Sequence, residues 1–193
     1  MVTQAKRRRI TSAPPWQRTA KSTFWCPACG GPLDTGASLP LVCQVCGKPV
    51  IITEGILNFV AGTARTRLDD IDYDTFYSID ADHSQRLYQS LQRAAGDLWP
   101  DDFGTALEIG CGTGGLSLAL FSQIRANTVV LTDISPKMLR ICRDRLTNNI
   151  PDKTKDFIYA TYSGTERCFK RNIFDSCFGT AVVHHVTDVP TFL

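Results

Sequence analysis

The sequence predicts an α/β protein with a doubly wound parallel sheet, preceded by a small cysteine-rich module. Three observations lead to this prediction: two CxxC pairs in the first quarter of the chain, a glycine-rich loop after a short apolar run, and a second apolar run that ends on an acid. With 193 residues, of which 43% are hydrophobic, the chain is long enough for one ordinary domain and one small one.

The amino-terminal segment is basic and low in hydrophobic residues. Residues 1–25 contain six Lys or Arg and no acid, so the remainder is mildly acidic although the whole chain carries a formal charge of +2. Residues 1–22 are therefore predicted to form a disordered basic tail. Its Lys6–Arg9 run is either a solvated charge run or a contact for nucleic-acid phosphates or for nuclear import.

The composition argues against a membrane-spanning or secreted protein. No stretch approaches the ~20 apolar residues that a transmembrane helix needs, and the amino terminus lacks the apolar core of a secretion signal. A cytoplasmic location is expected. Because thiols stay reduced there, the eight cysteines are expected to be metal ligands or small buried hydrophobic residues.

Four of the cysteines form a candidate zinc site. Cys26 and Cys29 lie in CPACGG, Cys43 and Cys46 lie in CQVCGK, and 13 residues separate the two pairs. Each pair brings two thiolates together in one tight turn, and four thiolates close a tetrahedral, structural site around Zn²⁺. A redox-active CxxC and two disulfides are the alternatives, but the duplicated motif favours zinc. Residues 23–60 are assigned to this module, whose folding energy we expect the metal to supply.

A linker and a helix are predicted to follow. Residues 61–72 are polar and contain a glycine, as expected of a linker. The apolar positions from Phe76 to Ala95 then fit an amphipathic helix that breaks near Asp80. We expect this helix to pack against the sheet.

A glycine-rich loop follows the first predicted strand of the main domain. Residues 105–109 predict a short buried strand, and Gly110, Gly112, Gly114 and Gly115 come before and at the start of a helix. Such a loop lets a ligand approach the backbone at a helix amino terminus. Because the spacing also satisfies the dinucleotide pattern GxGxxG, the loop alone leaves an NAD-dependent oxidoreductase open.

Glu108, at the end of the strand before the loop, separates these two possibilities. A carboxylate there would repel a pyrophosphate by roughly a kcal/mol or more across ~4–6 Å, whereas it would attract a cationic, phosphate-free nucleoside. The acid followed by alternating glycines, Glu108, Gly110, Gly112 and Gly114, is similar to the cofactor motif of class I S-adenosylmethionine-dependent methyltransferases.

The next apolar run predicts a central parallel strand. It covers residues 129–131 and ends on Asp133, which would accept hydrogen bonds from both ribose hydroxyls of an adenosine group. Ile134 could lie against the adenine. Ser135 as N-cap and Pro136 at the first helical position start the following helix.

Together these stretches resemble a zinc ribbon joined to a methyltransferase. The run from Phe24 to Val60 is similar to the ribbon in front of certain methyltransferases, including rRNA guanine methyltransferases, and to small methyltransferase-activating proteins. LEIGCGTG and LTDISPKML resemble class I enzymes of the ubiquinone and menaquinone type. The resemblance implies a Rossmann-like methyltransferase domain over residues 73–193. It would transfer a methyl group from S-adenosylmethionine to an unidentified small molecule or RNA base, with the tail and ribbon as a candidate RNA contact.

The resemblance also implies roles for single residues. A helix at the start of such a domain often covers the cofactor, with Tyr73 or Tyr77 nearby. The family's fourth strand, expected here over residues 174–183, carries the pair matched by His184 and His185. These histidines would shape the cleft or act as general base, and the catalytic residue stays unknown.

Two cysteines and the end of the third predicted strand carry further predictions. Cys111 and Cys142 are expected to be packing residues. After the third strand, expected over residues 156–160, family members usually place an acid that meets the adenine, but this chain has Thr161 and Tyr162. How the adenine would be recognised at this corner therefore stays open.

The predicted sheet has four strands where a class I methyltransferase has seven. We therefore expect a truncated or partial chain, inactive by itself, whose fourth strand is left as a bare apolar edge. A non-enzymatic module that binds RNA through the ribbon, with an incomplete methyltransferase fold, is the alternative to an enzyme.

Overall fold

The structure is a computed structural model that describes residues 19, 23–34, 40–60, 81–150 and 155–186. The tail apart from Thr19, the predicted linker, Tyr73 and Tyr77 lie outside these residues. So does the start of the predicted helix, up to residue 80. Among the described residues, no helix combines the length and apolar character needed to cross a membrane.

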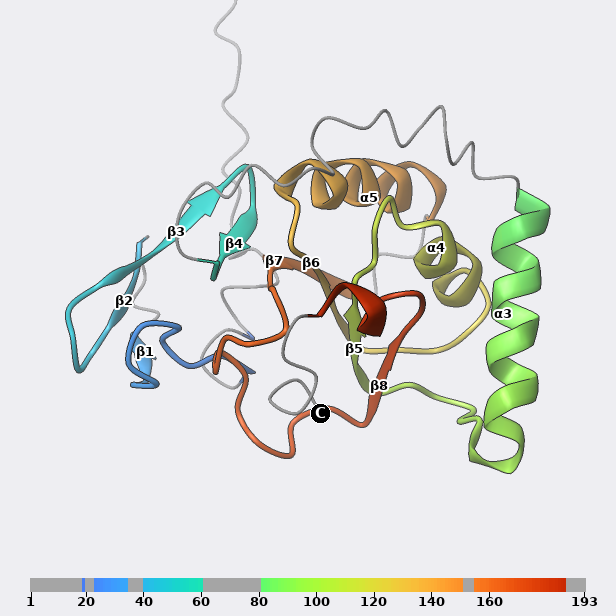
Figure 1. Cartoon of the computed structure of the whole chain (residues 1–193), viewed down its shortest axis with the longest axis horizontal. Coiled ribbons are helices and arrows are strands. Elements are labelled where there is room, and N and C mark those ends of the chain that lie inside the picture. Colours follow the sequence, from blue (N-terminus) through green and yellow to red (C-terminus); the bar gives the residue numbers. More distant parts are fainter. Residues whose placement is uncertain (1–18, 20–22, 35–39, 61–80, 151–154, 187–193) are drawn as a thin grey trace, which may run out of the picture.

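The described strands form one eight-stranded sheet in the order β1-β2-β3-β4-β7-β6-β5-β8 (Figure 1). The first four strands pair antiparallel, whereas β4, β7, β6, β5 and β8 are parallel neighbours. The strands are β1 (Leu33–Asp34), β2 (Leu41–Cys43), β3 (Pro49–Thr53), β4 (Ile56–Asn58), β5 (Thr105–Ile109), β6 (Thr128–Asp133), β7 (Asp156–Thr161) and β8 (Ser176–Gly179).

In the described part of the chain, three α-helices and two short 3₁₀ helices accompany the sheet. Ser135 is the N-cap of α5 as predicted, because its hydroxyl accepts a hydrogen bond from the Met138 N–H at 3.4 Å. Pro136 occupies the first helical position, also as predicted. The helices are α3 (Ala81–Ala95), η2 (Gly96–Leu98), α4 (Gly115–Phe121), α5 (Pro136–Asn149) and η3 (Val183–His185).

Side chains of the parallel strands alternate between two hydrophobic clusters, one on each face of the sheet. On β6, Val129 and Leu131 pack with residues of α3, α4 and α5, whereas Val130 points to the opposite face. The opposite face is covered by the cysteine-rich module, which contributes Phe24 and Leu57 among others. The parallel, Rossmann-like α/β sheet that the sequence predicts is confirmed for this part of the chain. The described helices lie on one face only, because the ribbon covers the face on which a doubly wound sheet carries its other helices.

The cysteine-rich module is built into the main sheet. Its last strand, β4, pairs in parallel with β7 over Ile56–Asn58. The start of the module also pairs with the segment after β7, because the Trp25 N–H donates to the Cys168 carbonyl at 2.8 Å and the Lys170 N–H donates to the Thr23 carbonyl at 3.0 Å. The ribbon thus gains apolar burial and backbone hydrogen bonds from the main domain, in addition to any metal it binds.

The fourth strand of the main domain is shorter than predicted. Residues 174–183 were expected to be extended, but β8 covers only Ser176–Gly179. The chain then reaches Ala181 in a left-handed conformation, with φ 54°, and enters η3. A strand cannot continue through that conformation, so the prediction was too long by several residues.

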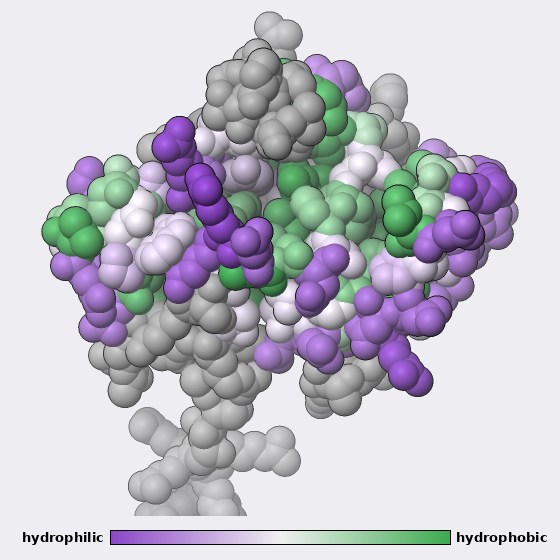
Figure 2. Space-filling model, turned by 90° about the horizontal axis from the view of Figure 1, so that it is seen from below, coloured by the Kyte–Doolittle hydropathy of each residue, from purple (hydrophilic) through white to green (hydrophobic). Residues whose placement is uncertain are grey.

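The outer side of β8 borders a cavity of about 330 Å³. Figure 2 shows the underside of the molecule, where hydrophobic residues gather between hydrophilic margins. The cavity lies between β8 and the end of α3, and its wall includes Leu98, Trp99 and Phe178. Because Asp175 and Ser176 also line it, it lies at the amino end of β8, away from the edge where ligands bind in open parallel sheets.

Candidate functional site

The glycine loop and two acids meet at the carboxyl end of the parallel strands. Ile109 of β5 lies opposite Thr132 of β6, and Asp133 lies opposite Thr161 of β7. The loop that begins at Gly110 and the side chain of Asp133 therefore share one edge of the sheet. In open α/β sheets this is the edge at which cofactors bind.

The glycines of the loop have different surroundings. Gly110, Gly112 and Gly114 all have positive φ, from 54° to 80°. A Cβ on Gly110 would lie 2.3 Å from Val182 Cγ2, and one on Gly114 would lie 2.5 Å from Cys142 Sγ, so both are packed against other segments. A Cβ on Gly112 would meet nothing within 4 Å. Gly112 thus gives the loop an open side that a ligand could approach.

Asp133 is fixed by two backbone donors. Its Oδ2 accepts from the Gly112 N–H at 2.9 Å, and its Oδ1 accepts from the Ser135 N–H at 2.9 Å. A carboxylate has about four acceptor sites, and ribose hydroxyls are donors of the kind that it takes. Ile134, the residue predicted to contact adenine, follows directly and is half-buried.

Glu108 lies behind the loop. It is 2% exposed, on the helix-facing side of β5, and its Oε2 accepts from the Ser117 hydroxyl of α4 at 2.7 Å. Burial raises the pKa of Glu108 to about 7, the Ser117 hydrogen bond lowers it in part, and the nearby Asp133 charge raises it further. A carboxyl group that is only partly ionised at neutral pH repels a pyrophosphate less than a full charge does. The preference for a cationic nucleoside over a pyrophosphate, which the sequence analysis based on Glu108, therefore depends on pH.

Cys111 and Cys142 are packing residues, as predicted. Both are buried in the cluster on the helix face, and Cys142 packs against Gly114. A hydrogen bond with Cys142, together with burial, raises the pKa of the Cys111 thiol well above its ordinary value. Both side chains lie beneath the loop, buried away from solvent.

The two histidines lie beside the loop but not on a strand. His184 and His185 are in η3, exposed, with ring centroids 3.9 Å apart. Val182, directly before η3, packs on Gly110, so the pair is close to the loop in space. The early end of β8 is the reason that they do not lie at a strand terminus.

The four predicted metal ligands converge. The Sγ atoms of Cys26, Cys29, Cys43 and Cys46 lie within 4.8 Å of one another, with 3.7 Å between Cys26 and Cys46 and 3.4 Å between Cys29 and Cys43. A ZnS₄ tetrahedron with bonds of ~2.3 Å has sulfur–sulfur edges of ~3.8 Å. The four thiols therefore fit one zinc ion.

The second knuckle also favours a thiolate. The Cys46 and Val45 N–H groups point at Cys43 Sγ from 3.5 and 3.4 Å. These hydrogen bonds, together with those from the Cys29 and Cys46 thiols, lower the pKa of Cys43 to about 6, whereas the contact with the Cys43 thiol raises the pKa of Cys29. Gly47, at φ 69°, supplies the left-handed residue that closes this turn.

Thr161 has a role that the sequence did not reveal. It occupies the corner where an acid was expected from the resemblance, and it is 2% exposed. Its Oγ1 accepts from the Phe59 N–H at 2.9 Å and from the Val60 N–H at 3.2 Å. The hydroxyl thus ties the end of the ribbon to the carboxyl end of β7. In the sequence, a hydroxyl residue at the end of a predicted strand is the only local sign of this role, and it does not indicate which residues the hydroxyl bonds.

Comparison with known proteins agrees with this arrangement. Residues 107–193 match a family model described as a methyltransferase domain. A solved structure from Methanococcus maripaludis, described as a candidate S-adenosyl-L-methionine-dependent methyltransferase, has 18% identity and a TM-score of 0.51 over 63% of this chain and 52% of its own. The fold of this part is therefore that of the S-adenosylmethionine-dependent methyltransferases.

Further solved structures match with higher sequence identity but lower TM-scores. An S-adenosylmethionine-dependent methyltransferase from Mesorhizobium loti has 24% identity and a TM-score of 0.43, over 52% of this chain and 44% of its own. The YcgJ protein of Bacillus subtilis has 20% identity and a TM-score of 0.44, over 57% and 42%. This chain thus spans about half the length of the structures it matches. No curated protein matches it.

Proposed function

We propose that this chain, whose residues 107–193 carry a methyltransferase domain, binds S-adenosylmethionine at the carboxyl end of its parallel strands. The observation that supports this most is the hydrogen bond from the Gly112 N–H to Asp133 Oδ2 at 2.9 Å. It joins the open loop to a fixed carboxylate, so that one adenosine group could lie along the loop and reach the acid with its ribose.

Each residue of the proposed site has a separate task. Gly112, with its neighbours Gly110 and Gly114, provides the surface over which the cofactor lies, Asp133 accepts from its ribose hydroxyls, and Ile134 lies against its adenine. When it is ionised, Glu108 attracts the positive charge of the bound cofactor from behind the loop. When bound, the cofactor supplies an activated methyl group and its leaving group, so the protein has mainly to align the acceptor.

The proposed acceptor is a small molecule or an RNA base. His184 and His185 are the candidate general bases, because η3 lies next to the loop and both side chains reach solvent. A base at that place would take a proton from an oxygen or nitrogen acceptor. A carbon acceptor, or one that loses its proton to water, would leave the pair with a purely structural task.

The four-cysteine site is proposed to hold one structural Zn²⁺. With four thiolates around it, the metal would have no open position for a substrate. The proposed organisation keeps a tail over 1–22, the ribbon over 23–60, a linker over 61–72 and the methyltransferase domain over 73–193. Protein purified without chelator should contain about one zinc per chain, and a content near zero would contradict this site.

Equilibrium dialysis with radiolabelled S-adenosylmethionine tests the cofactor. Asp133→Asn should weaken binding at least about tenfold, because it removes a charged acceptor and sets an amide against two backbone donors. Asp144→Asn is the matched control, since this acid is exposed on α5 and pairs only with its neighbour Arg143 among the described contacts. An equal loss of affinity for S-adenosylmethionine in both variants, or no loss in either, would contradict the proposed site.

A further inference from the structure

The ribbon ends at the same edge of the sheet as the proposed cofactor site. Because β4 is parallel to β7, Asn58 lies opposite Thr161, and Thr161 lies opposite Asp133 on the next strand. Three neighbouring strands therefore place the end of the ribbon, a buried hydroxyl and the proposed ribose acid side by side. A ribbon with a purely separate role would not need to end there.

Hydrogen bonds connect these positions without a gap. The Phe59 and Val60 N–H groups donate to Thr161 Oγ1 at 2.9 and 3.2 Å. The Tyr162 N–H, one residue on, donates to the Asp133 carbonyl at 3.0 Å. Asp133 in turn accepts from Gly112 of the loop. The end of the ribbon is thus hydrogen-bonded to the carboxyl end of β7, and the glycine loop to the carboxyl end of β6. These two strand ends are hydrogen-bonded to each other.

The ribbon side of this connection reaches the metal site. Phe59 is buried, and its ring lies 5.0 Å from that of Phe24. Both rings belong to one hydrophobic cluster with Cys26 and Cys43, two of the four candidate zinc ligands. A change in how the four thiols are held would therefore alter the packing that orients Phe59.

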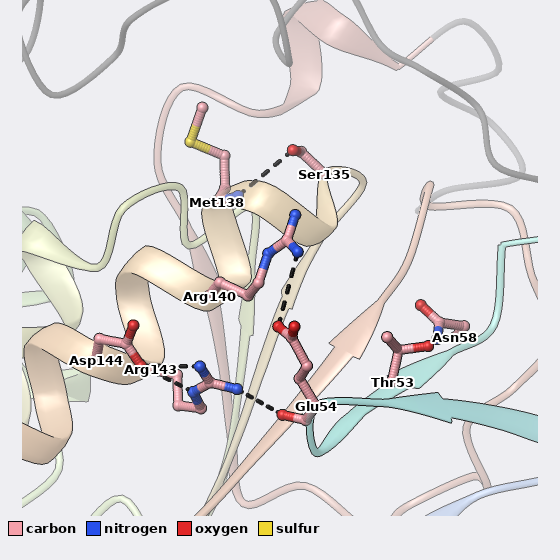
Figure 3. A network of polar contacts seen from close by, with 8 residues as sticks. All are labelled: Thr53, Glu54, Asn58, Ser135, Met138, Arg140, Arg143 and Asp144. Atoms are coloured by element: carbon pink, nitrogen blue, oxygen red, sulfur yellow. Dashed lines mark hydrogen bonds and ion pairs between the residues drawn. The ribbon is translucent and has the colours of Figure 1, made fainter.

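A second attachment holds the other end of the ribbon hairpin. Glu54, at the β3–β4 turn, faces two arginines of α5 (Figure 3). Its carbonyl accepts from Arg143, and its carboxylate lies 3.7 Å from Arg140. Because α5 begins three residues after Asp133, the hairpin is fixed to the proposed site at its turn as well as at its end.

We infer that Thr161 is a positioning residue that couples metal binding by the ribbon to cofactor binding at the sheet edge. The inference rests on the proposed function. Binding at the edge would hold Asp133 and Thr161 in place, and Thr161 would in turn hold Phe59 and the ribbon. By linkage, the cofactor and the metal each raise the affinity for the other by the same factor.

Thr161→Val removes the acceptor at nearly constant volume and leaves two backbone N–H groups without it. We expect the Kd for S-adenosylhomocysteine, measured by calorimetry on the zinc-loaded chain, to rise about fivefold, at the lower end of typical couplings. Zinc release to a chromogenic chelator should also quicken. Thr161→Ser keeps the hydroxyl and should restore both values. Thr53→Val is the matched control, because among the described residues the Thr53 hydroxyl accepts a hydrogen bond only from Asn58, within the exposed hairpin.

The wild-type chain provides a readout that needs no variant. Saturating S-adenosylhomocysteine should raise the affinity for zinc about fivefold, which is followed as slower zinc release to the chelator, and should protect the Phe59 and Val60 amides from hydrogen exchange. Binding of S-adenosylhomocysteine with unchanged zinc release and unchanged exchange would overturn the inference. If the wild-type chain does not bind the nucleoside at all, the proposed function fails first. Faster zinc release from Thr161→Val would then still show that the hydroxyl holds the ribbon.

Discussion

Glu108 is expected to destabilise the ligand-free fold at neutral pH. In Glu108→Gln, the side chain keeps the shape of the protonated acid, and its amide oxygen can still accept from the Ser117 hydroxyl. The groups that face Glu108 are Ser117 on α4, Asp133 on β6 and the Cys111 thiol of the loop. None of them is a cation that would favour the ionised carboxylate.

The size of the effect follows from the pKa of Glu108. Folding raises it from 4.5 to about 7, so between these values the folded chain holds a proton that the unfolded chain has lost. The contribution of this bound proton to the free energy of unfolding is complete below pH 4.5 and is lost as the pH rises to 7. At 1.36 kcal/mol per unit, the loss amounts to about 3 kcal/mol.

Urea unfolding of both proteins from pH 5 to pH 8 measures this contribution. The free energy of unfolding of the variant should rise relative to that of the wild type as the pH increases to about 7, and the difference should then level off, reaching about 3 kcal/mol by pH 8. Because zinc ligation changes equally in both, the difference between them isolates Glu108. Asp97→Asn, at an exposed acid of η2, is the control and should show no such trend. A difference that does not change with pH, or a variant that is less stable at pH 8, would refute the proposed burial of a partly protonated acid.

Three further outcomes test the fold. Leu57→Ala, in a side chain with no exposed surface, should lower the free energy of unfolding by about 2–5 kcal/mol, whereas Ile51→Ala, 66% exposed, should change it by less than about 0.5 kcal/mol in the same urea titration. Gly114→Ala should lower the melting temperature more than Gly112→Ala, because only at Gly114 does the new methyl group meet another side chain, 2.5 Å from a sulfur, while both have positive φ. Cys43→Ser should lower the zinc content well below one per chain, and a variant that keeps its full zinc would contradict the four-thiol site.

The parts that depend on short stretches of sequence were predictable. Residues 105–109 form β5 as expected, since a buried apolar run ahead of glycines has few alternatives. The Ser135–Pro136 helix start and the convergence of the four cysteines follow from local chemistry in the same way. In each case the residues that fix the geometry are neighbours in the chain.

The parts that depend on distant partners were not predictable. β4 is three residues long, and nothing in it indicates that it pairs with β7, about 100 residues later. The same holds for Thr161, whose partners Phe59 and Val60 belong to the other module. The depth of Glu108 was also missed, because a charged side chain at a strand end is usually taken to be solvated, and here α4 covers it.

Isothermal titration of the zinc-loaded chain with S-adenosylhomocysteine and, separately, with NADH addresses the cofactor most directly. At pH 8, where Glu108 is ionised, the demethylated nucleoside should bind and the dinucleotide should not. Tight binding of NADH with no heat from S-adenosylhomocysteine would show that the loop over Gly112 holds a pyrophosphate, and the methyl donor would have to be abandoned.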